Sequence, residues 1–208
     1  MDYTSRFGLD FNPFIKNSKE ITIETSEYKE SIYRLNVLLE TRGFGVLTGS
    51  PGKGKTTIVR NWAGSLNPSQ FKVIYSPLST LTVLEFYKNL ASKFGLDPMM
   101  RKIDNFKIMQ TEIKRYAIEK RITPVIIIDE ANYINNSILN DLKLLFNFEM
   151  DSRDHAVMVL VGLPQLNNTL RLSVHEPLRQ RITMNYHLDG LNKEDAKNYI
   201  YHKLKGAN

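Results

Sequence analysis

The residues best suited to chemistry lie in one stretch, Gly49-Ser50-Pro51-Gly52-Lys53-Gly54-Lys55-Thr56. This stretch fits G-x-x-x-x-G-K-[ST], the pattern of a phosphate-binding P-loop. Glycines in such a loop let backbone N–H groups turn inward around a phosphate without a clash from Cβ. The ammonium group of Lys55 would face the β- and γ-phosphates of a nucleoside triphosphate, and the Thr56 hydroxyl would bind Mg²⁺.

The surroundings of this loop favour the same chemistry. A short apolar run at 44–48 predicts a strand before the loop. The residues from about Lys55 to Leu66 predict a helix after it, whose N-terminal dipole attracts phosphate. The alternative, a glycine-rich turn with a solvated lysine, requires no such order of strand, loop and helix. We therefore expect ATP to be bound by the whole loop: Gly49, Ser50, Pro51, Gly52, Lys53, Gly54, Lys55, Thr56 and Thr57.

Two carboxylates follow another apolar run, Val125–Ile128. The run is short and β-branched, which predicts a strand buried on both faces of a parallel sheet. Ligands of such sheets bind beyond the carboxyl ends of the strands. Asp129 suits the carboxylate that holds Mg²⁺ in P-loop enzymes, and Glu130 would point to the other side and could polarise an attacking water. The alternative is a strand that merely ends in a charged turn.

The elements that must position these residues alternate along the chain. Strands are predicted at 44–48, 71–75, 125–128, 156–161 and 182–188, with helices between them. One helix begins at the capping box of Thr82 and Glu85, and Asn192 with Asp195 caps the last helix. This alternation implies right-handed crossovers and an α/β fold, with a doubly wound parallel five-stranded sheet flanked by helices.

The two ends of the chain are expected to differ from this central part. Residues 1–24 are rich in aromatic side chains, and Pro13 forbids a continuous helix there, so an irregular linker is expected. Residues 25–188 form the predicted α/β domain. Residues 189–208 are expected to lie beyond this domain and to contain the last helix.

The composition narrows the class of protein. The 208 residues are 42% hydrophobic and 24% charged, contain no cysteine and hold no apolar run of 18 residues. We therefore expect a cytoplasmic protein without a membrane span, disulfide or thiolate metal site. The four histidines lack the spacing of metal ligands.

The net charge of +6 has two interpretations. It is compatible with solubility alone, and it is also typical of proteins that bind a phosphate backbone. Basic residues concentrate in a predicted helix over 105–121, where a solvated helix face and a nucleic-acid contact are both open.

The combination of GSPGKGKT and VIIIDE resembles the AAA+ class of P-loop ATPases. The chain is more narrowly similar to ExeA-like ATPases, a group related to the transposition ATPases TnsC, TniB, IstB and MuB. The matches keep their order along nearly the whole chain: Phe7-Gly8-Leu9 with Pro13-Phe14, Asp129-Glu130-Ala131-Asn132, Leu160 to Leu166, Leu178 to Ile182, and Tyr199-Ile200 through Leu204 to Gly206.

The resemblance implies roles for individual residues. ATP and Mg²⁺ are the expected cofactors, held by Lys55, Thr56 and Asp129, with Glu130 as the base. Arg181 matches the arginine that AAA+ proteins present to the γ-phosphate bound by a neighbouring subunit, where it stabilises charge on the transferred phosphoryl group. Arg179 is a competing candidate, and both arginines could instead be surface charges.

Some positions depart from the family pattern. The family has a polar residue after the fourth strand that can hydrogen-bond a phosphate. That position falls near Leu163, whose side chain cannot make such a bond, so either Gln165 or no residue makes it. Ser76 could hold Glu130 inactive until a ligand binds, or simply end a strand. The resemblance implies that residues 189–208 are the start of a helical lid, and we expect these residues to form its first helix without the further arginine that the family carries on the lid.

The resemblance leaves several functions open. The first is an ATPase that forms an oligomer, a ring or a filament, on double-stranded DNA and recruits a transposase. The second is an ATPase that assembles secretion or cell-envelope machinery. The third is a nucleotide-dependent switch that does not hydrolyse ATP. The sequence does not identify the transposase or other partner, the target site or the number of subunits.

Overall fold

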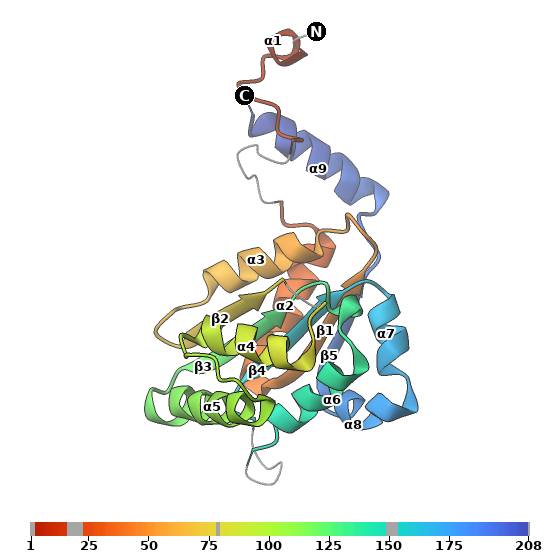
Figure 1. The fold of residues 1–208 in the computed structure, drawn as a ribbon. Helices are drawn as coiled ribbons and strands as arrows, with labels where there is room; N and C mark the ends of the chain where they lie inside the picture. The colour runs from red at the N-terminus through yellow and green to blue at the C-terminus, as the bar shows by residue number, and fades with distance from the viewer. Residues whose placement is uncertain (1–2, 16–22, 78–79, 149–153, 208) are drawn as a thin grey trace. The chain divides into compact units, whose positions relative to one another are not determined.

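The computed structural model describes residues 3–15, 23–77, 80–148 and 154–207 (Figure 1). Its sheet has five strands in the order β2-β3-β4-β1-β5, and every neighbouring pair is parallel. The strands are β1 (Gly43–Gly49), β2 (Phe71–Ser76), β3 (Thr123–Ile128), β4 (Val157–Gly162) and β5 (Ile182–Leu188). The predicted parallel five-stranded α/β fold is therefore confirmed.

Helices cover both faces of this sheet (Figure 1). One face packs against α4 (Val83–Phe94), α5 (Lys102–Lys114) and α6 (Asn136–Leu145), in a cluster that includes Phe44, Val46, Ile126 and Ile128. The opposite face carries α2 (Ser26–Thr41) and α3 (Lys55–Ser65), which are joined by a 3.0 Å hydrogen bond from Trp62 Nε1 to Asn36 Oδ1. Alternate residues of β1 and β3 thus enter two separate apolar layers.

Local signals in the sequence set several element boundaries. Thr82 and Glu85 form the predicted capping box of α4, in which the Thr82 N–H donates to Glu85 Oε2 at 2.9 Å. The Asp195 N–H donates to Asn192 Oδ1 at 2.7 Å and so caps α9 (Lys193–Lys205). Strand β5 has one open edge and alternates between buried and more exposed residues, as predicted for an edge strand.

The structure differs from the predicted elements in three parts of the chain. The segment 1–24 was expected to be irregular but contains a short helix, α1 (Tyr3–Phe7), because Pro13 restricts only its own surroundings. The helix predicted over 105–121 starts earlier, at Lys102, and passes at its end into the π-helical turn η1 (Arg115–Glu119). Two elements not predicted, η4 (Ser173–His175) and α8 (Glu176–Arg179), follow α7 (Gln165–Leu170).

The chain divides into two compact units. The larger unit, Ile32–Asp189, contains the sheet and the P-loop. The smaller unit joins Met1–Ser31 to Gly190–Asn208, and within it Ser26 Oγ donates to Asp195 Oδ2 at 2.6 Å and the Asp10 N–H donates to the Ala207 carbonyl at 2.7 Å. Among the helices that the structure describes, none has the length and apolar character needed to cross a membrane.

Candidate nucleotide site

The P-loop connects a fully buried strand to the first turn of a helix. Strand β1 ends at Gly49, and the next five residues are exposed up to Lys55, where α3 begins. Gly52 and Gly54 have φ angles of 78° and 84°, in the left-handed region that glycine adopts without a Cβ penalty. Gly54 has no side chain to cap α3, so backbone N–H groups at the start of this helix remain available to an anion.

Lys55 is held close to the base of this loop. Its Nζ donates to the carbonyl oxygens of Gly49 at 2.8 Å and Ser50 at 3.0 Å, and only 8% of the residue is exposed. An ammonium group fixed by two carbonyls supplies a positive charge beside the backbone N–H groups of the loop. This arrangement suits the phosphates of a nucleoside triphosphate.

The structure brings Thr56 and Asp129 together, although β1 and β3 are not adjacent in the sheet. The Thr56 hydroxyl donates to Asp129 Oδ2 at 2.9 Å. Both residues follow the carboxyl end of a parallel strand, one through the P-loop and one directly, so both reach the same edge of the sheet. Asp129 is 5% exposed, and its other oxygen, Oδ1, accepts the Glu130 N–H at 2.9 Å.

These oxygens fit Mg²⁺. A hydroxyl and a carboxylate are hard ligands, and Mg²⁺ is commonly held by one or two protein oxygens together with substrate phosphates and water. The described residues contain no group of three or more acidic or histidine side chains that would form a complete protein cage for a metal. Thr56 and Asp129 are therefore the residues that would hold the ion beside a bound nucleotide.

Glu130 lies at the same edge in an unusual backbone conformation. It has a φ of 53°, is exposed, and precedes the 3-10 turn η2 (Ala131–Tyr133). A left-handed conformation costs a residue with a side chain about 1–2 kcal/mol. Strain of this kind is concentrated at functional sites, and here it accompanies a carboxylate that faces solvent next to the predicted metal ligand.

Tyr75 is a site residue that the sequence reasoning missed. Its hydroxyl donates to Asp129 Oδ2 at 2.8 Å, and partial burial together with this hydrogen bond to Asp129 raises the pKa of Tyr75 to about 12. Tyr75 pairs with Ile127 across β2 and β3, so it shares a face with Asp129, two residues further on. Strand alternation in the sequence would have suggested this contact only once β2 was known to lie beside β3.

Other predicted polar residues have different partners. Ser76 is buried and its hydroxyl donates to Asn89 Oδ1 at 3.2 Å. Asn132 Oδ1 accepts the Leu163 N–H at 2.9 Å and so ties the turn after β3 to the end of β4. Gln165 is exposed at the start of α7. The structure therefore links Leu163 to the site through its backbone and through Asn132, which the sequence analysis named in the family match without assigning it a role.

The two candidate arginines lie away from the P-loop of their own chain. Arg181 immediately precedes β5, and so lies at the amino-terminal edge of the parallel sheet, whereas Lys55 and Asp129 follow the carboxyl ends of their strands. The half-buried Arg181 donates from Nη1 to the Lys143 carbonyl in the last turn of α6 at 3.1 Å. Arg179 is exposed and donates to the Arg171 carbonyl at 3.2 Å.

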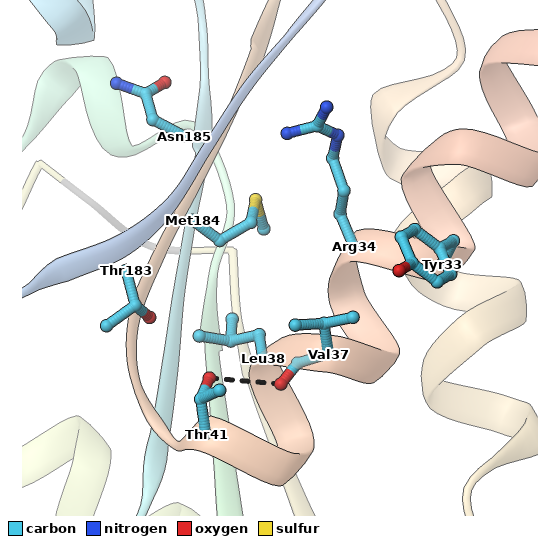
Figure 2. Close-up of a pocket in the computed structure, with 8 residues that line it drawn as sticks. All are labelled: Tyr33, Arg34, Val37, Leu38, Thr41, Thr183, Met184 and Asn185. Atoms are coloured by element: carbon cyan, nitrogen blue, oxygen red, sulfur yellow. Dashed lines mark hydrogen bonds between the residues drawn. The ribbon is translucent and has the colours of Figure 1, made fainter.

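A hollow of about 490 Å³ lies elsewhere, between α2 and β5 (Figure 2). Its walls are Tyr33, Arg34, Val37, Leu38 and Thr41 of α2 and Thr183, Met184 and Asn185 of β5. Met184 and Asn185 pair with the middle of β1, before the P-loop begins. No residue predicted to bind nucleotide lines this hollow, so the chemistry of the P-loop, and not the size of a cavity, identifies the candidate site.

Comparison with known proteins agrees with the fold and the loop. Residues 38–170 match the family model for the AAA domain, and this chain belongs to that family. It is therefore an ATPase of the P-loop class, as the sequence predicted.

The whole chain has a curated relative. It is 30% identical over 210 residues to general secretion pathway protein A of Aeromonas hydrophila, an alignment that covers 99% of this chain and 38% of the relative. The chain thus spans well under half the length of that protein.

Two solved structures share the fold at low sequence identity. Cdc6p from Pyrobaculum aerophilum has a TM-score of 0.69 at 13% identity, covering 93% of this chain and 53% of its own. The Aeropyrum pernix ORC1 protein in complex with DNA has a TM-score of 0.62 at 14% identity. The match covers 93% of this chain and 53% of the ORC1 chain.

Proposed function

We propose that this ATPase hydrolyses ATP with Mg²⁺ at a site completed by a second copy of the chain. The observation that carries the proposal is the 2.9 Å hydrogen bond between Thr56 and Asp129, which joins the two halves of a nucleotide site at the carboxyl edge of the sheet. Arg181 supports the second part, because it lies at the opposite edge and is oriented away from its own P-loop.

Each residue has a distinct task in this proposal. Backbone N–H groups of the P-loop and the ammonium group of Lys55 bind the phosphates and neutralise their charge. Thr56 and Asp129 would hold Mg²⁺, which would supply charge stabilisation to the phosphates. Glu130 orients a water molecule and accepts its proton. Arg181 of one copy stabilises the charge that develops on the phosphoryl group bound by the next copy.

The role of Glu130 is tested with Glu130→Gln. We expect ATP hydrolysis to fall by roughly 10²–10⁴-fold, because proton transfer to a positioned base is lost. Binding of a fluorescent ATP analogue should remain unchanged, since the amide keeps the size of the side chain. Glu40→Gln alters an exposed glutamate of α2 and serves as the matched control. Equal and near-zero phosphate release by wild type and Glu130→Gln would instead favour a switch that does not hydrolyse ATP.

The biological task that we propose is ATP-dependent assembly on double-stranded DNA in the regulation of transposition, with a transposase as partner. Its support is the resemblance in sequence to transposition ATPases, the net charge of +6, and a structural neighbour that was solved in complex with DNA. Contacts to DNA phosphates release counterions, so binding should weaken steeply as salt increases. An anisotropy titration of labelled duplex at low salt with ATP measures this, and absence of binding would overturn the DNA proposal.

A second candidate task is assembly of secretion or envelope machinery. It is favoured by one observation, the alignment of 99% of this chain with general secretion pathway protein A. Electron microscopy with ATP, with and without duplex DNA, separates the two. Rings or filaments that form only with DNA support the first task, and ATP-dependent assembly that ignores DNA supports the second.

A further inference from the structure

One carboxylate oxygen in the site accepts two hydroxyl groups. Asp129 Oδ2 receives the Thr56 hydroxyl at 2.9 Å and the Tyr75 hydroxyl at 2.8 Å. The remaining oxygen, Oδ1, receives the Glu130 N–H at 2.9 Å. A carboxylate with three donors on its two oxygens has little freedom to rotate, so its orientation toward a metal ion is fixed before the ion arrives.

Among these three donors, Tyr75 comes from a residue with no predicted role in binding ATP or Mg²⁺ or in hydrolysis. Thr56 is itself a predicted metal ligand, and the Glu130 N–H belongs to the backbone that follows Asp129. Tyr75 comes from a different strand, β2, and reaches Asp129 because β2 and β3 are adjacent and in register. It therefore supplies a hydrogen bond that depends on the packing of the sheet.

The exposure of Tyr75 argues against a purely structural role. Tyr75 is 39% exposed, although it lies inside strand β2. The neighbouring β2 residues Ile74 and Ser76 are buried instead. The hydroxyl of Tyr75 thus bonds to Asp129 from a side chain that remains partly exposed.

We infer that Tyr75 is a positioning residue for the metal: its hydroxyl holds the Asp129 carboxylate in the orientation that binds Mg²⁺ beside ATP. Partners of this kind, which contact a metal ligand and not the metal, typically change metal affinity by about 10–100-fold when removed. The inference rests on the proposed nucleotide site. It adds that this chain uses a tyrosine of β2 to set how strongly nucleotide binding depends on Mg²⁺.

The test is Tyr75→Phe, which removes only the hydroxyl. Affinity for a fluorescent ATP analogue is measured in EDTA and across a Mg²⁺ titration, together with the ATPase rate at each Mg²⁺ concentration. We expect the Mg²⁺ concentration that gives half of the maximal increase in affinity for the ATP analogue to rise about tenfold. Affinity in EDTA and the ATPase rate at saturating Mg²⁺ should stay near those of wild type. Tyr133→Phe, an exposed tyrosine of the turn after β3, is the matched control.

Two results would overturn the inference. An unchanged Mg²⁺ titration of Tyr75→Phe would show that the hydroxyl does not position Asp129 for the metal. An equal loss of affinity with and without Mg²⁺ would show a general structural role. Both differ from failure of the proposed function, in which wild type itself shows no Mg²⁺-dependent binding of the ATP analogue.

Discussion

The side chain of Asp129 is the point at which separate parts of the sequence meet. It is 5% exposed, and a buried carboxylate is costly unless its oxygens accept hydrogen bonds. Thr56, Tyr75 and the backbone of Glu130 provide those bonds. The site is therefore organised by one acidic residue whose donors come from the P-loop, from a neighbouring strand and from its own turn.

Lys55 offers a prediction at this scale. Lys55→Ala removes both the ammonium charge and its bonds to the Gly49 and Ser50 carbonyls. Because hydrogen bonds to charged groups contribute about 1.5–3 kcal/mol, affinity for an ATP analogue should fall by roughly 10–100-fold. Lys93→Ala, at an exposed lysine of α4 away from the loop, is the control and should stay within about threefold of wild type, as expected for a solvated charge. Similar losses in both variants in a fluorescence titration would contradict the prediction.

At the scale of elements, short polar contacts fix the ends of helices that carry site residues. His175 is the last residue of η4, and its side chain is fully buried against α6. Its Nδ1 lies 3.2 Å from Asn140 Oδ1 and its Nε2 lies 2.9 Å from Asn136 Oδ1. This contact attaches η4 and α8 to α6. Arg181, which follows α8, donates a hydrogen bond to the Lys143 carbonyl in the last turn of α6. The segment that presents both candidate arginines is thus anchored at two points on α6.

The buried ring of His175 predicts a dependence of stability on pH. Burial lowers the pKa of His175 from its ordinary value of 6.5. Below about pH 6.5 the unfolded chain therefore binds a proton that the folded chain does not, so stability is lost as the pH falls through the folded-state pKa. Urea unfolding at several pH values should show a smaller loss in His175→Gln than in wild type. His202→Gln changes an exposed histidine and is the control. Parallel pH profiles for wild type and His175→Gln would refute the prediction.

The capping box of α4 gives a second prediction for an element. Thr82→Ala removes the hydroxyl that accepts the Glu85 N–H at 3.4 Å and bonds to its carboxylate at 2.7 Å. Loss of an N-cap side chain costs about 1 kcal/mol of the free energy of unfolding. Thr111→Ala, at an exposed position inside α5, is the control and should not destabilise, because alanine favours helix. Chemical denaturation of both variants measures the difference.

At the scale of the whole molecule, the parallel sheet places the candidate residues at two opposite edges. The P-loop and Asp129 lie at the carboxyl edge, and Arg181 lies at the amino-terminal edge before β5. A contact that repeats head to tail can bring the second edge of one copy to the first edge of the next, and such contacts generate rings or filaments. This geometry supports assembly as part of the proposed function.

A mixing experiment tests the shared site. Arg181→Ala and Glu130→Gln should each hydrolyse ATP poorly when alone. In an equal mixture, about a quarter of randomly formed contacts would pair an intact Glu130 with an intact Arg181, so part of the activity should return. A mixture no more active than its components would contradict a finger that acts between copies. Arg179→Ala is measured in parallel. If Arg179→Ala fails to hydrolyse ATP while Arg181→Ala remains active, Arg179 is the finger that acts between copies.

The sequence by itself determined the features that depend on residues close together in the chain. These local patterns are the P-loop spacing, the buried strand before Asp129, the two helix caps, and the alternation of strands and helices. They were sufficient to predict the five-stranded parallel fold and the ATPase class.

Only the tertiary structure decided which distant residues touch. The order β2-β3-β4-β1-β5 brought Tyr75 to Asp129, and the turn after β3 brought Asn132 to Leu163. The parallel pairing of β5 with β1 placed Arg181 at the sheet edge opposite its own P-loop. The physical reason is that strand order and side-chain contacts depend on long-range burial, whereas motif spacing and caps depend on hydrogen bonds within a few residues.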